Sequence, residues 1–479
     1  MRVLIESIKF ENHPIFGSNL VSFVDHKGRV AKNILLVGEN GSGKTKLLET
    51  INECLNATYF INFLSKPSSE ITINVTISNS TYLSTVQGKK ITKAKLMSFR
   101  RPDGGFEHSV DLFDEDGVRV NEYIDTSTSR TQTRSDFTLK SIFSGVEINY
   151  KMMSPIGSIT RRTLDDGNLD IYNNADIAND ITQLFVDICA QDNADTAQYM
   201  DSICKKAGEG LISVNCQNLP RKRMDRFLGA YKFMFGYNLT FYNITDNTTP
   251  VFQKGKKQLK IEDLSSGEKQ VIFRGASLLK NINNVIGYPV LIDEPELSMH
   301  PKWEQKSYNY YKKMFSDSDN MQESQIVFAT HSEHVISSAL EDDEALIIDS
   351  SSMSGDNNHK YRIVSKDYNN NILPSTTIAE IKYQIFHIPS IDYHISLYSY
   401  IQENMTRCNR IVKVDKFLQA NSAPAYPSSY GDTDYYTLPT YIRNRIDHPK
   451  NNEHFTYDQL EESIEYMVNL ICSLRNDSQ

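Results

Sequence analysis

The strongest constraint on what this chain can fold into is the segment at positions 38–45. It reads Gly38, Glu39, Asn40, Gly41, Ser42, Gly43, Lys44 and Thr45, which satisfies the pattern G-x-x-x-x-G-K-[ST]. The segment follows the apolar run NILLV, typical of a strand buried on both faces of a sheet, and a helix is predicted to begin near Lys44. A strand, a glycine loop and a helix in this order present backbone N–H groups and the positive end of a helix dipole at one point. The sequence therefore predicts an anion site within an α/β fold.

The residue types in this segment match the phosphates of a nucleotide. Its glycines let the backbone wrap the phosphates, and we expect Lys44 to reach the β- and γ-phosphates. The hydroxyl of Thr45 is suited to bind Mg²⁺. We therefore expect ATP and Mg²⁺ as ligands, with every residue of 38–45 in contact with the nucleotide.

A second apolar run, YPVLIDE at 288–294, ends in two acids. At the end of a buried strand, Asp293 is placed to bind Mg²⁺, and Glu294 is placed to act as the general base that activates water. An apolar strand that ends in Asp-Glu also occurs without any catalytic role, so the assignment depends on its combination with segment 38–45.

A third segment, LSSGE at 264–268, stands at the start of a predicted helix that continues through KQVIFRGASLLKNI. Serine and glycine at a helix N-terminus make an anion site, for which Ser265, Ser266, Gly267 and Glu268 are the candidates. Because this helix leads on into the strand that ends at Asp293, the anion is expected to come from a second subunit. The alternative is that Ser265 does no more than cap the helix.

A fourth segment, ATHS at 329–332, follows the apolar run QIVF and places His331 at the tip of a strand. From there the imidazole is suited to contact a γ-phosphate and to take part in catalysis beside Glu294. A histidine in this position is also common as a purely structural residue.

The order of these four segments resembles the ABC ATPase superfamily, with its Walker A, signature, Walker B and switch-histidine elements. The sequences of these segments are similar to those of the OLD/RecF/SMC-like branch; they read GENGSGKT, LSSGEKQ, IDEPELSMHP and FATHSEHVI. IDEPELSMHP in particular resembles stand-alone ATPase subunits of bacterial antiphage systems such as the Septu, PARIS and retron-linked systems. The resemblance covers about residues 1–350. It implies a P-loop ATPase with a mixed sheet and a head-to-tail homodimer in which LSSGE of one protomer closes over ATP held by the other, with higher oligomers left open.

Between these segments the hydrophobic period changes, which divides the chain into regions. Short alternating segments at about 58–149 predict strands, and helical spacing at about 165–237 predicts an inserted helical lobe, both within an ATPase domain of residues 1–350. From 376 to 479 the spacing is helical again and predicts an all-α C-terminal domain. A long heptad segment is missing, which argues against tethering over long distances.

The helical C-terminal region contains a second candidate site. Arg443 and His448 lie near one helical face, and their spacing resembles the R-x4-H motif of HEPN ribonucleases, whose sites form between two bundles and need no metal. The alternative is a helix end that His448 and Pro449 terminate, with Arg443 bonded to a neighbour. The same region also suits a docking surface for an effector protein.

The composition narrows the setting in which the chain acts. Its formal net charge is -9, and its six cysteines are scattered without a C-x-x-C pair, which is typical of free thiols in a reducing, cytoplasmic setting. We expect no membrane insertion, because no apolar run approaches the length of a spanning helix. Basic clusters at 221–226 and 254–257 are candidates for nucleic-acid contact, or else solvated faces.

The hypothesis that combines these observations is an ATP-binding and ATP-hydrolysing sensor and scaffold of an antiphage defence system that controls a partner nuclease. One alternative is a self-contained, ATP-regulated HEPN-like ribonuclease built on Arg443 and His448. Another is a RecF-like DNA-repair ATPase.

Overall fold

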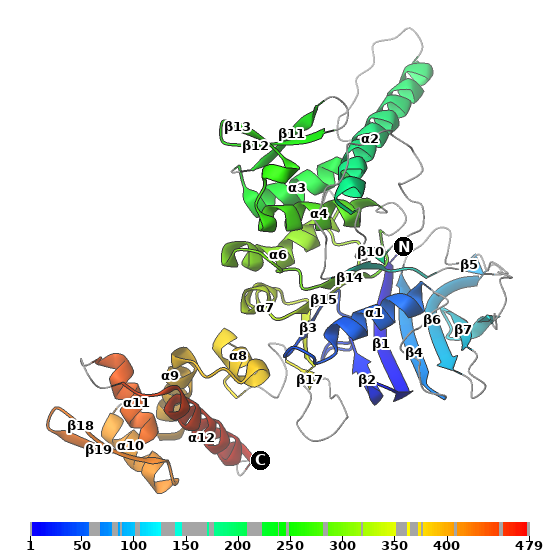
Figure 1. The fold of residues 1–479 in the computed structure, drawn as a ribbon. Helices are drawn as coiled ribbons and strands as arrows, with labels where there is room; N and C mark the ends of the chain where they lie inside the picture. Colours follow the sequence, from blue (N-terminus) through cyan, green and yellow to red (C-terminus); the bar gives the residue numbers. More distant parts are fainter. Residues whose placement is uncertain are drawn as a thin grey trace. The chain divides into compact units, whose positions relative to one another are not determined.

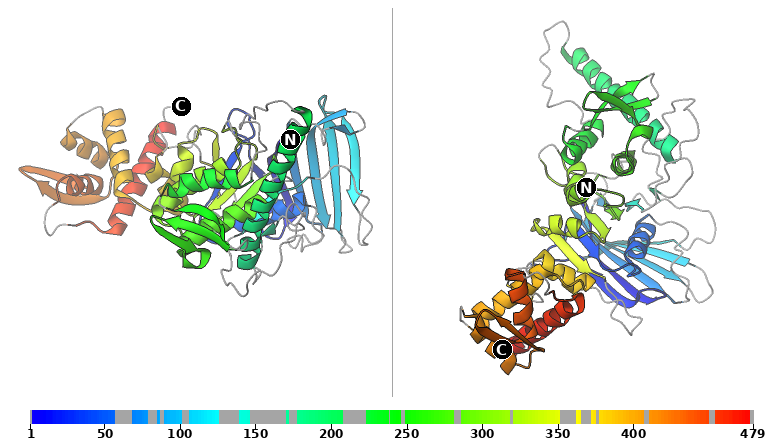
Figure 2. Two further views of the ribbon diagram at one scale, coloured as in Figure 1. Left: turned by 90° about the horizontal axis from the view of Figure 1, so that it is seen from above. Right: turned by 60° about the vertical axis from the view of Figure 1, so that its left-hand side comes forward.

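The computed structural model shows two compact units, Met1–Arg362 and Ile363–Gln479, which are described separately below (Figures 1 and 2). The division falls between the two domains expected at 1–350 and 376–479. The structure describes residues 2–56, 68–78, 85–86, 89–100, 106–125, 139–145, 170–171, 177–207, 223–237, 239–245, 249–280, 286–317, 320–350, 362–364, 372–374, 377–406, 410–449 and 454–476.

A parallel sheet forms the centre of the first unit. Its strands lie in the order β10 (Asp170–Ile171), β9 (Ile142–Ser144), β14 (Val290–Asp293), β15 (Ile326–Thr330), β3 (Asn33–Val37), β16 (Ala345–Asp349) and β17 (Arg362–Ile363). The pairs from β10 to β16 are all parallel. Every residue of β3, β14 and β15 is buried, as the apolar runs predicted. The carboxyl ends of these strands therefore meet at one edge of the sheet.

An antiparallel sheet forms a second layer of this unit. Its order is β2 (Gly17–Ser22), β1 (Arg2–His13), β4 (Glu70–Ser78), β6 (Lys89–Arg100), β7 (Phe106–Asp114) and β8 (Arg119–Asp125), with β5 (Thr85–Val86) beside β6. In Figure 2 these are the blue to cyan strands. Strands β4 to β8 lie in the region 58–149 that was predicted to be rich in strands, and β9 from that region belongs to the parallel sheet.

A buried amide joins the two sheets. The side chain of Gln325 accepts a hydrogen bond from the Ile5 N–H at 2.8 Å, and it donates to the carbonyls of Ile5 at 3.1 Å and Ala31 at 2.8 Å. Since Gln325 is fully buried, each of these bonds forms away from water. The first strand of the chain is thereby fixed against the start of β15.

Helices cover both layers. Helix α1 (Lys44–Leu55) contacts β9, β14 and β15 of one sheet and β6 of the other, so it lies between them (Figure 1). The inserted lobe contains α2 (Ile177–Ala207) and α3 (Arg223–Phe235), which pack on α4 (Ser266–Lys280). Residues 170–171, predicted within the helical lobe, instead form strand β10.

The remaining elements of the first unit lie around this lobe. A small sheet of β11 (Thr240–Thr245), β12 (Thr249–Lys254) and β13 (Lys257–Lys260) leads into a 3-10 turn, Ile261–Asp263, just before α4. Helix α6 (Pro301–Met314) packs on α3 and on α7 (Glu333–Leu340).

The second unit is built around a cluster of apolar side chains on helices. These helices are α8 (Ile378–Phe386), α9 (Ile391–Tyr400) with a π-helical turn at Ile401–Thr406, α10 (Ile411–Ala420), α11 (Leu438–Asp447) and α12 (Tyr457–Asn476). The α9 and α12 helices lie side by side in Figure 1. Leu397, Val414, Ile442, Ile464 and Ile471 are fully buried in the core between them.

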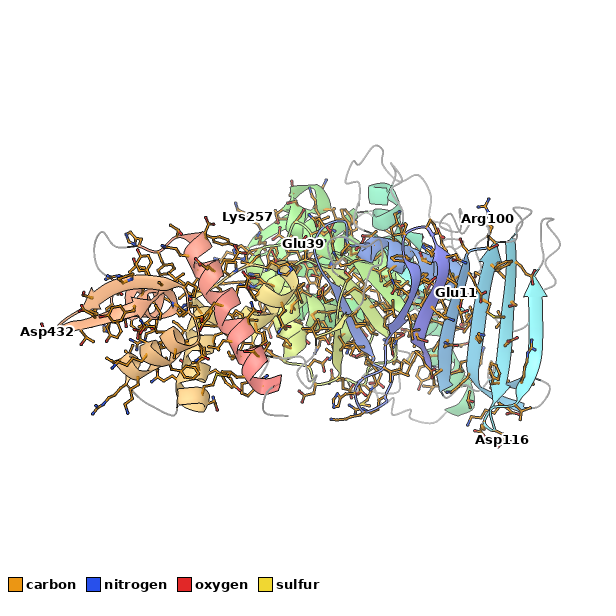
Figure 3. All side chains as sticks on the ribbon, turned by 90° about the horizontal axis from the view of Figure 1, so that it is seen from below. Glu11, Glu39, Arg100, Asp116, Lys257 and Asp432 are labelled. Carbon is orange, nitrogen blue, oxygen red and sulfur yellow. The ribbon has the colours of Figure 1, made fainter. Side chains whose placement is uncertain are left out.

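The expectation of an all-α domain needs one correction, because this unit also contains a hairpin. Strands β18 (Ala425–Tyr430) and β19 (Thr433–Thr437) pair antiparallel within the range 376–479, for which helical spacing predicted helices alone. Asp432, labelled in Figure 3, lies at the hairpin tip, next to Gly431 with φ +60°. Glycine reaches this left-handed conformation without a steric cost, which permits the tight turn. Alternating half-buried and exposed positions along β18 replace the helical period.

The hairpin generates a prediction about stability. The buried carboxylate of Asp415 accepts hydrogen bonds from the Tyr436 N–H at 2.9 Å and from the Thr437 N–H and hydroxyl at 3.1 and 2.6 Å. We expect Asp415→Ala to destabilise this unit by about 2–4 kcal/mol, because buried donors lose a charged acceptor.

The single tryptophan, Trp303, lies in the first unit, so its fluorescence reports on the unfolding of that unit. On heating, the far-UV circular dichroism of Asp415→Ala should show an earlier transition, while Trp303 fluorescence changes at the wild-type temperature. A far-UV transition at the wild-type temperature would contradict the role given to Asp415.

Candidate functional site

Two glycines of the loop at 38–45 combine a positive φ with close neighbours that a side chain would meet. Gly43 has φ +87°, and a Cβ there would lie 3.1 Å from a ring carbon of Phe16. Gly38 has φ +147°, and a Cβ there would lie 2.8 Å from Oγ of Ser350. The same Oγ is 2.9 Å from Oγ of Ser42. The loop is therefore held between the turn after β1 and the residue after β16.

Lys44 points back into this loop. Its Nζ donates to the carbonyl oxygens of Gly38 and Glu39, both at 2.9 Å, and to Oγ of Ser42 at 3.2 Å. It also lies 3.5 Å from Nδ1 of His331. The Lys44 ammonium thus donates its hydrogen bonds to oxygens of the loop, and a bound phosphate would take the place of these oxygens.

The charge balance around Lys44 is unusual. Burial lowers the pKa of Lys44 to about 8, and the negative charges of Asp293, Glu294, Glu296 and Asp349 act in the opposite direction. A buried ammonium with a lowered pKa and several carboxylates around it is typical of a functional site rather than of a surface contact.

Asp293 and Thr45 meet the requirements of a magnesium site. Asp293 is 1% exposed, its burial raises its pKa to about 6, and a hydrogen bond from the Thr45 side chain acts to lower it. Oδ2 of Asp293 is enclosed and has no hydrogen-bond partner among the residues that the structure describes. An unpartnered carboxylate oxygen beside a hydroxyl fits Mg²⁺, which binds through few protein ligands and completes its shell with phosphates and water. Clusters of His, Cys, Asp or Glu that would hold a metal by themselves are absent from the described residues.

Glu294 stands at the end of β14 in a strained backbone conformation, with φ +44°. One of its oxygens lies 3.5 Å from Nε2 of His331, so the predicted base and the predicted phosphate sensor face each other. Burial and the charge of Lys44 both lower the pKa of His331, which favours the neutral imidazole.

Arg274 on α4 supports this strand end, and sequence reasoning missed it. Its side chain is fully buried and donates to the carbonyls of Asp293 at 2.6 Å, Glu294 at 2.9 Å and Gly145 at 3.0 Å. The signal in the sequence was an arginine inside the apolar run VIFRGASLL, since a charge at a buried helical position requires partners.

Two further acids were missed in IDEPELSMHP and the residues after it. Oε1 of Glu296 accepts hydrogen bonds from the Thr330 hydroxyl and from the backbone N–H groups of His331 and Ser332. Glu304 on α6 accepts a hydrogen bond from the Ser332 hydroxyl at 2.7 Å. Carboxylates from the segment that follows Glu294 therefore hold the loop that carries His331 through hydrogen bonds.

The LSSGE segment forms the expected helix N-terminus. The N–H and hydroxyl of Ser265 both donate to Oε2 of Glu268 at 2.8 Å, and Lys254 donates to its other oxygen at 2.8 Å. Ser265 and Ser266 are exposed, whereas Glu268 is buried. The serines are thus open to an external ligand, while the carboxylate of Glu268 shapes the loop.

Gly267 is required by its own protomer. A Cβ at this position would lie 2.7 Å from the carbonyl oxygen of Ser298 and 3.3 Å from the ring of Trp303. Ser298 itself has φ +61°. The glycine is therefore needed for packing against the loop after β14, whatever approaches from outside.

Arg443 and His448 lie at the same end of α11 but have different partners. Arg443 pairs with Asp447 at 2.6 Å and donates to the side chain of Asn444 at 3.1 Å. The His448 ring stacks on Tyr430 of β18, with centroids 4.6 Å apart and planes 18° apart. His448 also ends the helix, as in the alternative interpretation of this segment.

The basic clusters differ in their surroundings. In the cluster at 221–226, Arg223 and Arg226 are buried, and Arg226 pairs with Glu323 at 2.7 Å. Residues 221 and 222 lie outside the described residues. Lys254 of the second cluster binds Glu268, as noted above. Within the parts of the chain that the structure describes, no helix is both long and apolar enough to cross a membrane.

Comparisons with solved structures find SMC head domains. The chain is similar to an SMC head bound to the C-winged helix domain of ScpA, with 15% identity, TM-score 0.42 and coverage of 76% of this chain and 98% of that one. It is similar to the SMC head domain from Thermotoga maritima at 13% identity and TM-score 0.35, covering 76% and 100%. A Pyrococcus furiosus SMC head with an extended coiled coil is similar at 13% identity and TM-score 0.41, covering 76% and 96%.

No curated protein matches the chain. A family model does match, over residues 34–337, and this range spans the glycine loop, LSSGE, the Asp-Glu strand and the histidine loop. Since the match covers more than half of the chain, the protein belongs to the family described as "AAA domain, putative AbiEii toxin, Type IV TA system".

Proposed function

We propose that this chain binds and hydrolyses ATP with Mg²⁺ at a site shared by two copies of itself. The observation that supports this most directly is the convergence of Lys44, Asp293, Glu294 and His331 from three neighbouring parallel strands. Lys44 follows β3, the two acids end β14, and His331 follows β15. Side chains at the carboxyl edge of a parallel sheet are placed to act on one ligand.

Each side chain has a distinct role in the proposed reaction. Lys44 neutralises phosphate charge, and Thr45 with Asp293 holds Mg²⁺, which polarises the phosphate oxygens. Glu294 accepts a proton from the attacking water, and its position is fixed by the hydrogen bonds of Arg274 to the backbone. His331, which lies 3.5 Å from both Lys44 and Glu294, would contact the γ-phosphate.

The second copy would complete the site from outside. Ser265 and Ser266 are exposed at the N-terminus of α4, where the helix dipole favours an anion. In a head-to-tail homodimer these serines would close over the γ-phosphate of the partner. This arrangement would make ATP binding and dimerisation interdependent.

The biological role in this proposal is control of a partner nuclease in antiphage defence. The family description, which includes a toxin of a toxin–antitoxin system, supports a role in conditional toxicity. The second unit, with Arg443 and His448 engaged by Asp447 and Tyr430, would then dock the effector. The nucleotide state of the first unit would decide whether the effector is held or released.

Replacing Glu294 by glutamine tests the hydrolysis step. Glu294→Gln should retain ATP binding and slow hydrolysis by about two to four orders of magnitude, because the amide keeps the shape but cannot accept the proton. Steady-state phosphate release and the affinity for a fluorescent ATP analogue measure the two effects. Near-normal turnover would move the base to another residue.

Mixing two inactive variants tests the shared site. Lys44→Ala removes the phosphate-binding ammonium, and Ser266→Asp puts a negative charge against the partner's γ-phosphate. Aspartate is favourable in the first turn of a helix, and Ser266 is exposed, so Ser266→Asp should fold normally. Gly267 is unsuitable for this test because of its contact with Ser298.

We expect each variant to be inactive alone and the mixture to regain about one quarter of wild-type turnover, because half of randomly formed dimers are mixed and each has one intact site. The control mixes Lys44→Ala with Glu294→Gln. In that mixed dimer each substitution damages the phosphate-loop site of its own protomer, so neither site is intact. A mixture of Lys44→Ala and Ser266→Asp without activity would contradict the shared site.

The ribonuclease alternative makes an opposite prediction. If Arg443 and His448 were catalytic, the protein would cleave RNA without metal, and alanine at either position would abolish cleavage but spare ATP hydrolysis. We expect wild-type protein to leave total RNA intact in EDTA, with or without prior loading with ATP. Cleavage by wild type that is lost in both Arg443→Ala and His448→Ala would replace the scaffold by an intrinsic ribonuclease.

A further inference from the structure

One carboxylate oxygen accepts three hydrogen bonds from the segment that carries His331. Oε1 of Glu296 accepts hydrogen bonds from the Thr330 hydroxyl at 2.6 Å, the His331 N–H at 2.9 Å and the Ser332 N–H at 3.1 Å. Strand β15 ends at Thr330, so the next two N–H groups lie beyond the hydrogen bonds of the sheet. Glu296 supplies the acceptor that these groups need in a buried setting.

The position of the His331 backbone decides where its imidazole lies. Nε2 is 3.5 Å from Oε1 of Glu294, and Nδ1 is 3.5 Å from Nζ of Lys44. An imidazole between two groups at these distances would lose both contacts if its backbone moved by about 1 Å. The ring also forms a hydrogen bond with the backbone of Gly38, which acts to raise the pKa of His331, while the His331 backbone is held by its N–H bond to Glu296.

We propose that Glu296 is a positioning residue, a hydrogen-bond acceptor that fixes His331 between Lys44 and Glu294. This inference rests on the proposed ATP hydrolysis and adds a residue to it. In this role Glu296 neither abstracts a proton nor binds the metal, although it lies only two residues from the proposed base.

The contacts indicate that the length of the Glu296 side chain, its reach, matters more than its charge. Oε1 carries all three hydrogen bonds, while Oε2 is enclosed and has no partner in the described part of the chain. Burial raises the pKa of Glu296, and a proton on Oε2 would leave the bonds to Oε1 intact. An amide oxygen at the same place can accept the same donors.

Two conservative variants separate reach from charge. Glu296→Gln keeps the length of the side chain and removes its charge, whereas Glu296→Asp keeps the charge and withdraws the oxygen by one methylene. We expect Glu296→Gln to retain kcat within about threefold and Glu296→Asp to lose about 30-fold or more, with KM for ATP little changed in both. Glu294→Gln provides the contrast, because there the amide should slow turnover by about two to four orders of magnitude.

A double variant tests whether Glu296 acts through His331. His331→Ala alone should lower kcat, and adding Glu296→Asp should lower it by no more than about threefold further, because both changes remove the same element. A multiplicative loss would show that Glu296 acts independently and would overturn the proposal. Loss of turnover in Glu296→Gln equal to that in Glu296→Asp would overturn it as well, since charge would then be the property that matters.

Hydrogen exchange tests the contact without any turnover. The amides of His331 and Ser332 should exchange slowly in wild type and in Glu296→Gln, and at least about tenfold faster in Glu296→Asp. Fluorescence of Trp303 checks that each variant is folded. If wild type hydrolyses no ATP, the proposed function fails while this measurement still decides the contact. Equal exchange in wild type and Glu296→Asp would refute the role of Glu296.

Discussion

Parallel pairing of β14, β15 and β3 is the constraint on which the rest of the site depends. The register places Asp293 opposite Ala329, and Thr330 opposite Val37. Backbone hydrogen bonds thus bring β3 to one edge with β14 and β15, which follow it by more than two hundred residues of sequence. A slip of one residue in this register would turn the neighbouring side chains to the other face of the sheet.

Electrostatics at this edge depends on the burial of two opposite charges. Lys44 is enclosed, and its pKa is lowered to about 8, while Asp293 is enclosed with a pKa raised to about 6. Each group by itself is disfavoured in its charged form, so each gains from a charged ligand of opposite sign. Phosphate and Mg²⁺ together would satisfy both groups at once. Protein residues alone do not, since Oδ2 of Asp293 lacks a partner within the described residues.

What could be predicted from the sequence is local in character. The glycine loop, the Asp-Glu strand end and the helix start at Ser266 each depend on a few adjacent residues with a known backbone preference. Arg274, Glu296 and Ser350 escaped prediction because their partners lie far away along the chain. Ser350 contacts Ser42 across more than three hundred residues, and no periodicity in the sequence encodes that distance. The hairpin β18–β19 was missed for a different reason, since short strands around a glycine turn resemble a polar loop.

Helix α4 connects the partner-facing surface to the proposed catalytic base within one rigid element. Its first turn carries the exposed Ser266 and packs Gly267 against Ser298, and its third turn carries Arg274 under the carbonyls of Asp293 and Glu294. Sliding α4 along β14 would break hydrogen bonds of a fully buried guanidinium, which costs several kcal/mol when no water replaces them. The exposed serines therefore keep a fixed place relative to Glu294 of their own protomer. In the proposed homodimer this rigidity would be needed, because each chain would position one half of two different sites.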